Sequence, residues 1–105
     1  MRCPVSSMKK ETQSTAQGIS TRVYLKNDLG MHARVAGLIF QTARKFNANV
    51  YIRKGDQEVS SDSVVEMLTL DCPKGTPLII RAEGEEARAA LESIVRLFEE
   101  KFGES

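Results

Sequence analysis

The only histidine of the chain, His32, is the side chain whose position best suits chemistry. It follows Gly30 closely, precedes Arg34 by two residues, and lies where a strand-like segment gives way to an amphipathic helix. The first N–H groups of a helix lack intrahelical partners and carry partial positive charge, so they attract anions such as a phosphoryl group. An imidazole nitrogen can attack phosphorus, and a guanidinium can bind phosphoryl oxygens with paired hydrogen bonds. Gly30 would let the backbone turn beside the ring, and Ala33 would contribute its N–H.

The residues alone leave a second interpretation of His32 open. A histidine in the first turn of a helix is commonly a capping or surface residue. Composition and spacing do not overturn that interpretation. Phosphoryl transfer depends mainly on positioning and charge neutralisation, so a histidine with one arginine suffices only if a partner protein supplies the rest of the site.

Hydrophobic periodicity indicates the elements that position His32. Apolar and polar residues alternate over residues 21–26, which predicts a strand with one buried face, and residues 27–30 interrupt the alternation. Apolar residues then recur at helical spacing from Val35 to Phe46. The sequence therefore predicts a strand, a tight break and a helix, with His32 at the break.

The second half of the chain predicts a hairpin, a strand and two helices. Ser63 with Glu66 three residues later is the capping-box signature of a helix start. The elements are a hairpin over residues 50–60, a short helix over 63–70, a strand over 78–82 and an amphipathic helix over 86–101. The order βαββαβα predicts an α+β fold in which a four-stranded, mostly antiparallel sheet carries three helices on one face.

Composition restricts the function classes. The 105 residues fit one domain, and the formal net charge of +1 argues against wholesale nucleic-acid binding, as does the lack of aromatics interleaved with basic residues on a strand face. Residues 1–53 carry nine Lys and Arg against two Asp and Glu, whereas residues 54–105 carry six against twelve. The first half could therefore present a basic patch to an acidic partner or a phosphate.

Cysteine usage and hydropathy indicate a cytoplasmic protein, and we expect a monomer that holds neither a metal nor another cofactor. Cys3 and Cys72 match no metal-ligand or redox spacing, so we expect two free thiols in a reducing compartment. No apolar run is long enough for a membrane helix or a secretory signal. Residues 1–19 are polar and predict a flexible extension before a domain over residues 20–105, and Met8 offers an alternative start.

Residues 29–36, Leu-Gly-Met-His-Ala-Arg-Val-Ala, resemble the active-site motif of the HPr family, which reads approximately G-[L/M]-H-[A/T/S]-R-P-A. These proteins are the histidine phosphocarriers of the phosphoenolpyruvate-dependent phosphotransferase system. Ser63 lies 31 positions after His32, the separation of the family's second-site serine, and residues 74–76 and 82–85 resemble its K-G-T and A-E-G-E segments. The resemblance covers residues 21–102 and implies an open-faced βαββαβα sandwich.

The resemblance implies a phosphocarrier function. Enzyme I, charged from phosphoenolpyruvate, would phosphorylate His32 on Nδ1, and an EIIA-type protein would accept the group. Arg34 would hold the phosphoryl group beside the backbone of Gly30 and Ala33. The wording of residues 29–32 and 70–75 is similar to the nitrogen-related branch, NPr, which favours a regulatory relay. A second function class stays open: an HPr-like regulatory binding module in which His32 is seldom phosphorylated.

Three features depart from the family pattern or have two interpretations. Val35 stands where the motif has Pro, which gives up some rigidity of the first turn and predicts slower or partner-altered transfer. Asp62 precedes Ser63, where members recognised by HPr kinase/phosphorylase carry Lys, Arg or Asn, so regulatory phosphorylation of Ser63 stays open beside its capping role. The hydrophobic side chains Val64, Val65 and Leu68 are expected to form a partner-docking patch, whereas Met67 and Leu70 are better candidates for the core.

Overall fold

The computed structural model describes residues 13–15 and 18–103, and side chains from residue 18 onward. Five strands, three α-helices and a terminal 3₁₀ turn follow one another along this part of the chain. Their bounds are β1 Gln13–Thr15, β2 Gly18–Tyr24, α1 Ala33–Ala43, β3 Asn49–Lys54, β4 Gln57–Ser60, α2 Val64–Leu68, β5 Pro77–Glu83, α3 Ala87–Glu99 and the 3₁₀ turn Lys101–Gly103.

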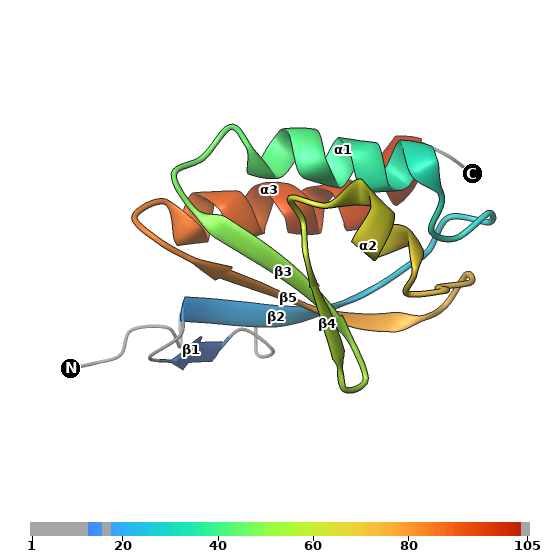
Figure 1. Ribbon diagram of the computed structural model, residues 1–105, viewed down its shortest axis with the longest axis horizontal. Helices are drawn as coiled ribbons and strands as arrows, with labels where there is room; N and C mark the ends of the chain where they lie inside the picture. The colour runs from blue at the N-terminus through green and yellow to red at the C-terminus, as the bar shows by residue number, and fades with distance from the viewer. Residues whose placement is uncertain (1–12, 16–17, 104–105) are drawn as a thin grey trace.

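The strands form one antiparallel sheet in the order β1-β2-β5-β3-β4. All three helices lie on the same side of it, so the other side carries no helix of the described part of the chain (Figure 1). Because β5 pairs with both β2 and β3, Ile79 has Arg22 as its neighbour on one side and Arg53 on the other. The predicted open-faced α+β sandwich is confirmed, with β1 as an additional edge strand.

The core lies between the inner face of the sheet and the helices. Alternation along β2 and β5 buries every second residue, as the sequence pattern predicted. The largest fully buried side chains from both layers are Leu25, Ile39, Ile52, Met67, Leu70, Leu78, Ile80, Leu91, Ile94 and Phe98. Met67 and Leu70, the predicted core residues of the short helix, are among them.

Several predicted boundaries shift in the structure. β2 begins at Gly18, three residues before the expected start at residue 21, and β1 lies within the span 1–19 that was expected to be an extension. The rest of that span, residues 1–12 and 16–17, lies outside the described residues, as does Cys3. α1 ends at Ala43 rather than at Phe46, which packs half-buried against the core from the following turn. The sequence did not indicate these first strand residues, because residues 13–20 are mostly polar and show no alternation of apolar and polar types.

Candidate functional site

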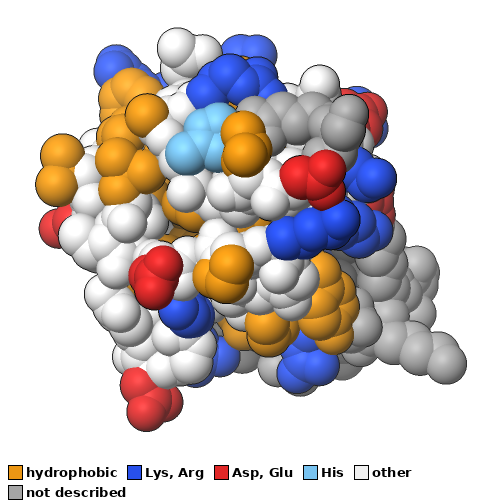
Figure 2. Space-filling model, turned by 90° about the vertical axis from the view of Figure 1, so that its right-hand side faces the viewer, with side chains coloured by type: hydrophobic (Ala, Val, Ile, Leu, Met, Phe, Trp, Pro, Cys, Tyr) orange, Lys and Arg blue, Asp and Glu red, His pale blue; other side chains and the backbone are white. Residues whose placement is uncertain are grey.

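His32 is the N-cap residue of α1. Its backbone is extended, with φ −153° and ψ 178°, and its carbonyl accepts the first intrahelical hydrogen bond from the N–H of Ala36 at 2.9 Å. Its side chain makes no capping hydrogen bond, and no acidic residue lies in the first turn. The N–H groups of residues 33–35 therefore have no intrahelical acceptor, and the positive end of the α1 dipole is not offset by a carboxylate of that turn. Figure 2 shows the half-buried histidine at the surface between hydrophobic and basic side chains.

A glycine contact with a distant loop fixes the backbone immediately before His32. Gly30 has φ +71°, and a Cβ added to it would overlap the carbonyl oxygen of Cys72. The N–H of Met31 donates to that same carbonyl oxygen at 2.8 Å. The buried side chain of Asn27 donates from Nδ2 to the carbonyl oxygen of Gly30 at 2.8 Å. Only glycine tolerates this combination of left-handed backbone and close approach, so Gly30 sets where His32 can lie.

The loop that carries Cys72 is itself held in place. Lys54 Nζ donates to the carbonyl oxygens of Leu70 at 2.9 Å and Asp71 at 2.6 Å. The Cys72 side chain is buried in the core, and this burial raises the pKa of its thiol. The sequence predicted only a plain thiol at this position. It is the backbone of Cys72 rather than its sulfur that positions the site.

An exposed ion pair adds a second link between the same two loops. Lys74 Nζ lies 2.7 Å from Asp28 Oδ1, and both side chains are largely solvent-exposed. The hydrogen bond and charge of Lys74 lower the pKa of the Asp28 carboxyl. Surface pairs of this kind contribute little to stability, so the backbone contacts at Gly30 and Met31 carry most of the positioning.

Arg34 lies on the first turn of α1 and reaches the other end of the chain. Its Nη2 donates to the carbonyl oxygen of Phe102 at 2.6 Å. Phe102 is buried, has φ +55° and belongs to the 3₁₀ turn after α3. A guanidinium carries five N–H donors in a planar fork. Arg34 is therefore placed beside His32 in sequence and anchored from the C-terminal turn, a contact that the sequence did not predict.

Ser63 has the capping role that the sequence predicted. Its Oγ accepts a hydrogen bond from the backbone N–H of Glu66 at 3.1 Å, and α2 begins at the next residue. The backbone N–H of Ser63 donates to the carbonyl oxygen of Ser60 at 3.2 Å. α2 contacts α1 on the helical side of the sheet (Figure 1). Ser63 thus has a full structural explanation that requires no phosphorylation.

The predicted hydrophobic patch is exposed in two of its three members. Val65 is 73% exposed and Leu68 is 40% exposed, whereas Val64 is half-buried against the core. Leu29, three residues before His32, is 76% exposed and was missed by the sequence analysis. The available signal was a large apolar residue inside a turn, where nothing requires its burial. Leu29, Val65 and Leu68 are called the apolar rim below.

The described residues hold no group of three or more His, Cys, Asp or Glu side chains suited to a metal ion. Within the same residues, no helix has the length and apolar character needed to cross a membrane. The start of α1 offers an imidazole at a helix N-terminus and, two residues on, a guanidinium.

Comparison with known proteins places this site in a family. Residues 19–100 match the family model described as the PTS HPr component phosphorylation site. The chain is 40% identical over 84 residues to phosphocarrier protein NPr of Proteus mirabilis, covering 79% of this chain and 93% of the relative. It is 33% identical over 78 residues to phosphocarrier protein HPr of Xylella fastidiosa, covering 74% and 88%.

A solved structure agrees with both the fold and the sequence match. HPr-C-His from Thermoanaerobacter tengcongensis superposes with a TM-score of 0.78 at 34% identity, and the match covers 82% of this chain and 97% of that one. The family model covers the start of α1, the loop of Cys72 that holds it, and α2 in one continuous match. The chain belongs to the HPr family of phosphotransferase-system phosphocarriers and is NPr-like in sequence.

Proposed function

We propose that the protein is a cytoplasmic phosphocarrier that accepts a phosphoryl group on Nδ1 of His32 from Enzyme I and passes it to an EIIA-type protein. The observation that carries this proposal is the N-cap position of His32 at a helix start without a side-chain cap or a first-turn carboxylate. An incoming phosphoryl group meets N–H groups and partial positive charge there. Membership of the HPr family supports the choice of phosphoryl as the anion.

In the proposed step, an imidazole nitrogen of His32 attacks the phosphorus of the phosphoryl group that Enzyme I carries. The new N–P bond forms as the bond between phosphorus and the donor breaks, so the donor is the leaving group and no water is consumed. The backbone at Gly30 and Ala33 and the guanidinium of Arg34 would neutralise charge on the phosphoryl oxygens. Because Arg34 Nη2 donates to the carbonyl oxygen of Phe102, this nitrogen would exchange one acceptor for another, or a different N–H of the fork would bind the phosphoryl group.

The apolar rim supports a role in partner binding. Exposed hydrophobic side chains that form a contiguous patch are typical of surfaces that dock another protein. Val65 and Leu68 lie on α2, and α2 contacts α1, the helix that His32 begins. Val64 would contribute less to docking than the sequence predicted, because its side chain is half-buried. The likeness to NPr relatives supports a regulatory relay rather than sugar import.

The test is phosphorylation by phosphoenolpyruvate and Enzyme I, followed by intact-mass measurement. We expect one added phosphoryl group that is labile in acid and stable in base, as expected for phosphohistidine. Addition of a purified EIIA-type protein should then discharge it. If this chain stays unlabelled while a control HPr in the same mixture is labelled, the proposal is wrong.

A second candidate function is the regulatory binding module in which His32 is seldom phosphorylated. The observation that favours it is Val35, buried at the third position of α1 where the family motif has Pro. Capture of a partner through the apolar rim, unchanged by His32→Ala, would favour this function over the phosphocarrier.

Regulation through Ser63 is a further part of the proposal. A phosphoryl group on Ser63 would place a dianion beside the apolar rim and weaken the docking of Enzyme I. Incubation with HPr kinase/phosphorylase and ATP should add one phosphoryl group to the wild type and none to Ser63→Ala. If the wild type gains none while a control HPr substrate is labelled, this form of regulation does not apply to this protein.

A further inference from the structure

The outer face of the sheet, opposite the helices, is uncovered by any helix of the described part of the chain (Figure 1). Side chains alternate along each strand, so one set of residues from β2, β3 and β5 shares this face. Arg22, Tyr24, Tyr51, Arg53 and Ile79 belong to it. The sequence predicted no aromatic side chains interleaved with basic ones on a strand face. That prediction was wrong, because Arg22 and Tyr24 share this face of β2, where they pair with Ile79 and Pro77 of β5.

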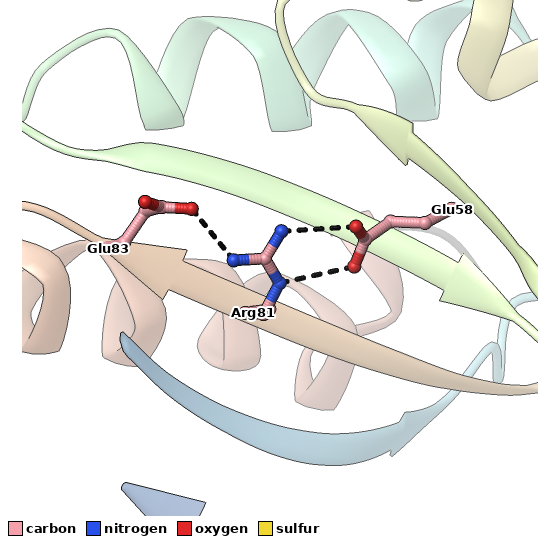
Figure 3. Close-up of polar contacts among 3 residues, drawn as sticks. All are labelled: Glu58, Arg81 and Glu83. Carbon is pink, nitrogen blue, oxygen red and sulfur yellow. Dashed lines mark hydrogen bonds and ion pairs between the residues drawn. The ribbon is translucent and has the colours of Figure 1, made fainter. Parts of the chain in front are cut away.

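One arginine on this face is fully engaged. Arg81 donates from Nε and Nη2 to the two carboxylate oxygens of Glu58 at 3.2 and 3.0 Å, and from Nη1 to Glu83 at 2.7 Å (Figure 3). Its guanidinium also lies 4.2 Å from the ring centroid of Tyr51. The hydrogen bonds and charges of Glu58 and Glu83 raise the pKa of Arg81 above its usual value, and the two carboxylates exceed its single positive charge by one. The charged side chains on this half of the face therefore pair with one another.

The other half is cationic. Arg22 and Arg53 are both exposed and flank the half-buried Ile79 from either side. Glu58 pairs with Arg53 across the strands, but both oxygens of its carboxylate accept hydrogen bonds from Arg81. Nothing in the described part of the chain pairs either Arg22 or Arg53 with a carboxylate. Arg22 and Arg53 therefore bring two positive charges to a face on which the cluster of Arg81, Glu58 and Glu83 carries one net negative charge.

A shallow, open depression of about 340 Å³ on this face is bordered by both arginines. Its lining is apolar and basic, with no acidic residue, and consists of Arg22, Tyr24, Arg53, Gly55, Pro77, Leu78 and Ile79. Tyr24 is 44% exposed beside it. The backbones of Arg22 and Arg53 are separated by two strand spacings, roughly 10 Å.

We propose that this depression docks an extended acidic segment of a partner protein, in which two carboxylates flank an apolar side chain. The carboxylates would bind Arg22 and Arg53, and the apolar side chain would cover Ile79. In an extended segment, side chains four residues apart lie on one face and roughly 13 Å apart, within reach of two flexible arginines. The surface is distinct from the face that carries His32, so it would hold a partner whether or not His32 is phosphorylated.

The same observations disfavour single-stranded nucleic acid as the occupant. The chain carries a net charge of only +1, whereas nucleic-acid-binding domains are commonly strongly basic. Stacking on successive bases requires several open aromatic rings. Tyr51 is covered by the Arg81 guanidinium, which leaves Tyr24 as the exposed ring of this face.

The test measures fluorescence anisotropy of a labelled peptide, Ser-Glu-Ser-Ile-Ser-Glu-Ser, titrated with the full chain at low salt. We expect saturable binding that weakens as salt rises, because exposed ion pairs are screened. An analogue with both Glu changed to Gln should bind at least about tenfold more weakly, as should the double variant Arg22→Glu with Arg53→Glu. The matched control is Arg88→Glu with Arg96→Glu, which makes the same change of net charge on exposed positions of α3 and should bind as the wild type does.

Three results would overturn the proposal. They are no saturable binding of the peptide by the wild type, equal binding by the Arg22 and Arg53 variant, or tighter binding of a thymidine oligonucleotide than of the peptide. Arg22→Gln with Arg53→Gln serves as a milder pair if charge reversal unfolds the chain. Phosphorylation of His32 should be unchanged in either pair, so failure of this proposal is distinguishable from failure of the phosphocarrier proposal.

Discussion

The helices α1 and α2 pack against each other on one side of the sheet (Figure 1), but they begin in different ways. At α2, Ser63 Oγ accepts a hydrogen bond from the N–H of Glu66, and Glu66 also places a carboxylate in the first turn. At α1, His32 occupies the N-cap position without a side-chain capping bond, and the first turn holds no acidic residue. Both helices start from extended N-cap residues, so the difference lies in the side chains.

This difference indicates which of the two helix starts is suited to bind an anion. A side-chain cap consumes an N–H group, and a first-turn carboxylate offsets the helix dipole. α2 is also only five residues long, so its dipole is small. α1 gives up the stabilisation that a Ser or Asp cap would provide, and an imidazole stands at that position instead. α3 also begins without a side-chain capping bond, but a glutamate, Glu86, stands at its N-cap, so α1 differs from both other helices in having no carboxylate at its start.

The largest expected difference between the two helix starts is seen when each N-cap side chain is removed. We expect His32→Ala to abolish phosphoryl incorporation from phosphoenolpyruvate and Enzyme I, because Nδ1 would be the acceptor atom. Ser63→Ala should still be labelled, because its hydroxyl acts on α2. Intact-mass measurement of both variants checks this, with circular dichroism to show that each is folded. Labelling of His32→Ala would mean that the acceptor is elsewhere.

The next largest effect concerns the contact that positions α1. Gly30→Ala should lower the free energy of unfolding by about 2–3 kcal/mol, because it adds a clash with the Cys72 carbonyl oxygen to a left-handed backbone. Gly55→Ala is the matched control, since Gly55 has φ +60° and open space around it, and should cost about 1 kcal/mol. Urea unfolding measures both. Equal losses in the two variants would show that the contact with Cys72 does not position the site.

Local patterns predicted the elements well because each pattern reflects a local cause. The alternation along β5, the helical spacing in α1 and α3, and the serine at the start of α2 all identified elements that the structure contains. The resemblance of residues 29–36 to the HPr motif supplied the candidate chemistry at His32, which periodicity alone left undecided. Boundaries shifted where the cause was not local, as at β2, whose first residues pair with β1 and β5.

The unpredicted parts of the site are contacts between distant segments. The Met31 N–H meets the carbonyl of Cys72, and Arg34 meets the carbonyl of Phe102, 68 residues away. Every residue carries a backbone carbonyl whatever its type, so no sequence pattern indicates either contact. The same holds for Arg22 and Arg53, which become neighbours of Ile79 only through strand order. Residue types indicate which side chains are reactive, but the topology of the fold determines which of them are neighbours.

A smaller effect is expected on stability when the Ser63 cap of α2 is removed. Ser63→Ala should lower the free energy of unfolding by about 1 kcal/mol, because the N–H of Glu66 loses its acceptor. Ser63→Asp should retain most of that stability, because aspartate also caps helices, while it adds a negative charge beside the apolar rim. Urea unfolding separates the two variants, and Enzyme I kinetics reports the charge. If Ser63→Ala were as stable as the wild type, the cap would not stabilise α2.

The smallest expected effect concerns the first turn of α1 itself. Val35→Pro restores the family motif at the third helical position, where the lost N–H has no intrahelical acceptor. Because proline fixes φ near the helical value, it should hold the turn more rigidly and raise the rate of His32 phosphorylation, by less than about tenfold. Val35 is buried, so urea unfolding must accompany the kinetics to correct for any loss of folded protein. An unchanged rate in fully folded Val35→Pro would mean that rigidity at this position does not limit transfer, and the open helix start at His32 would then be sufficient with either residue.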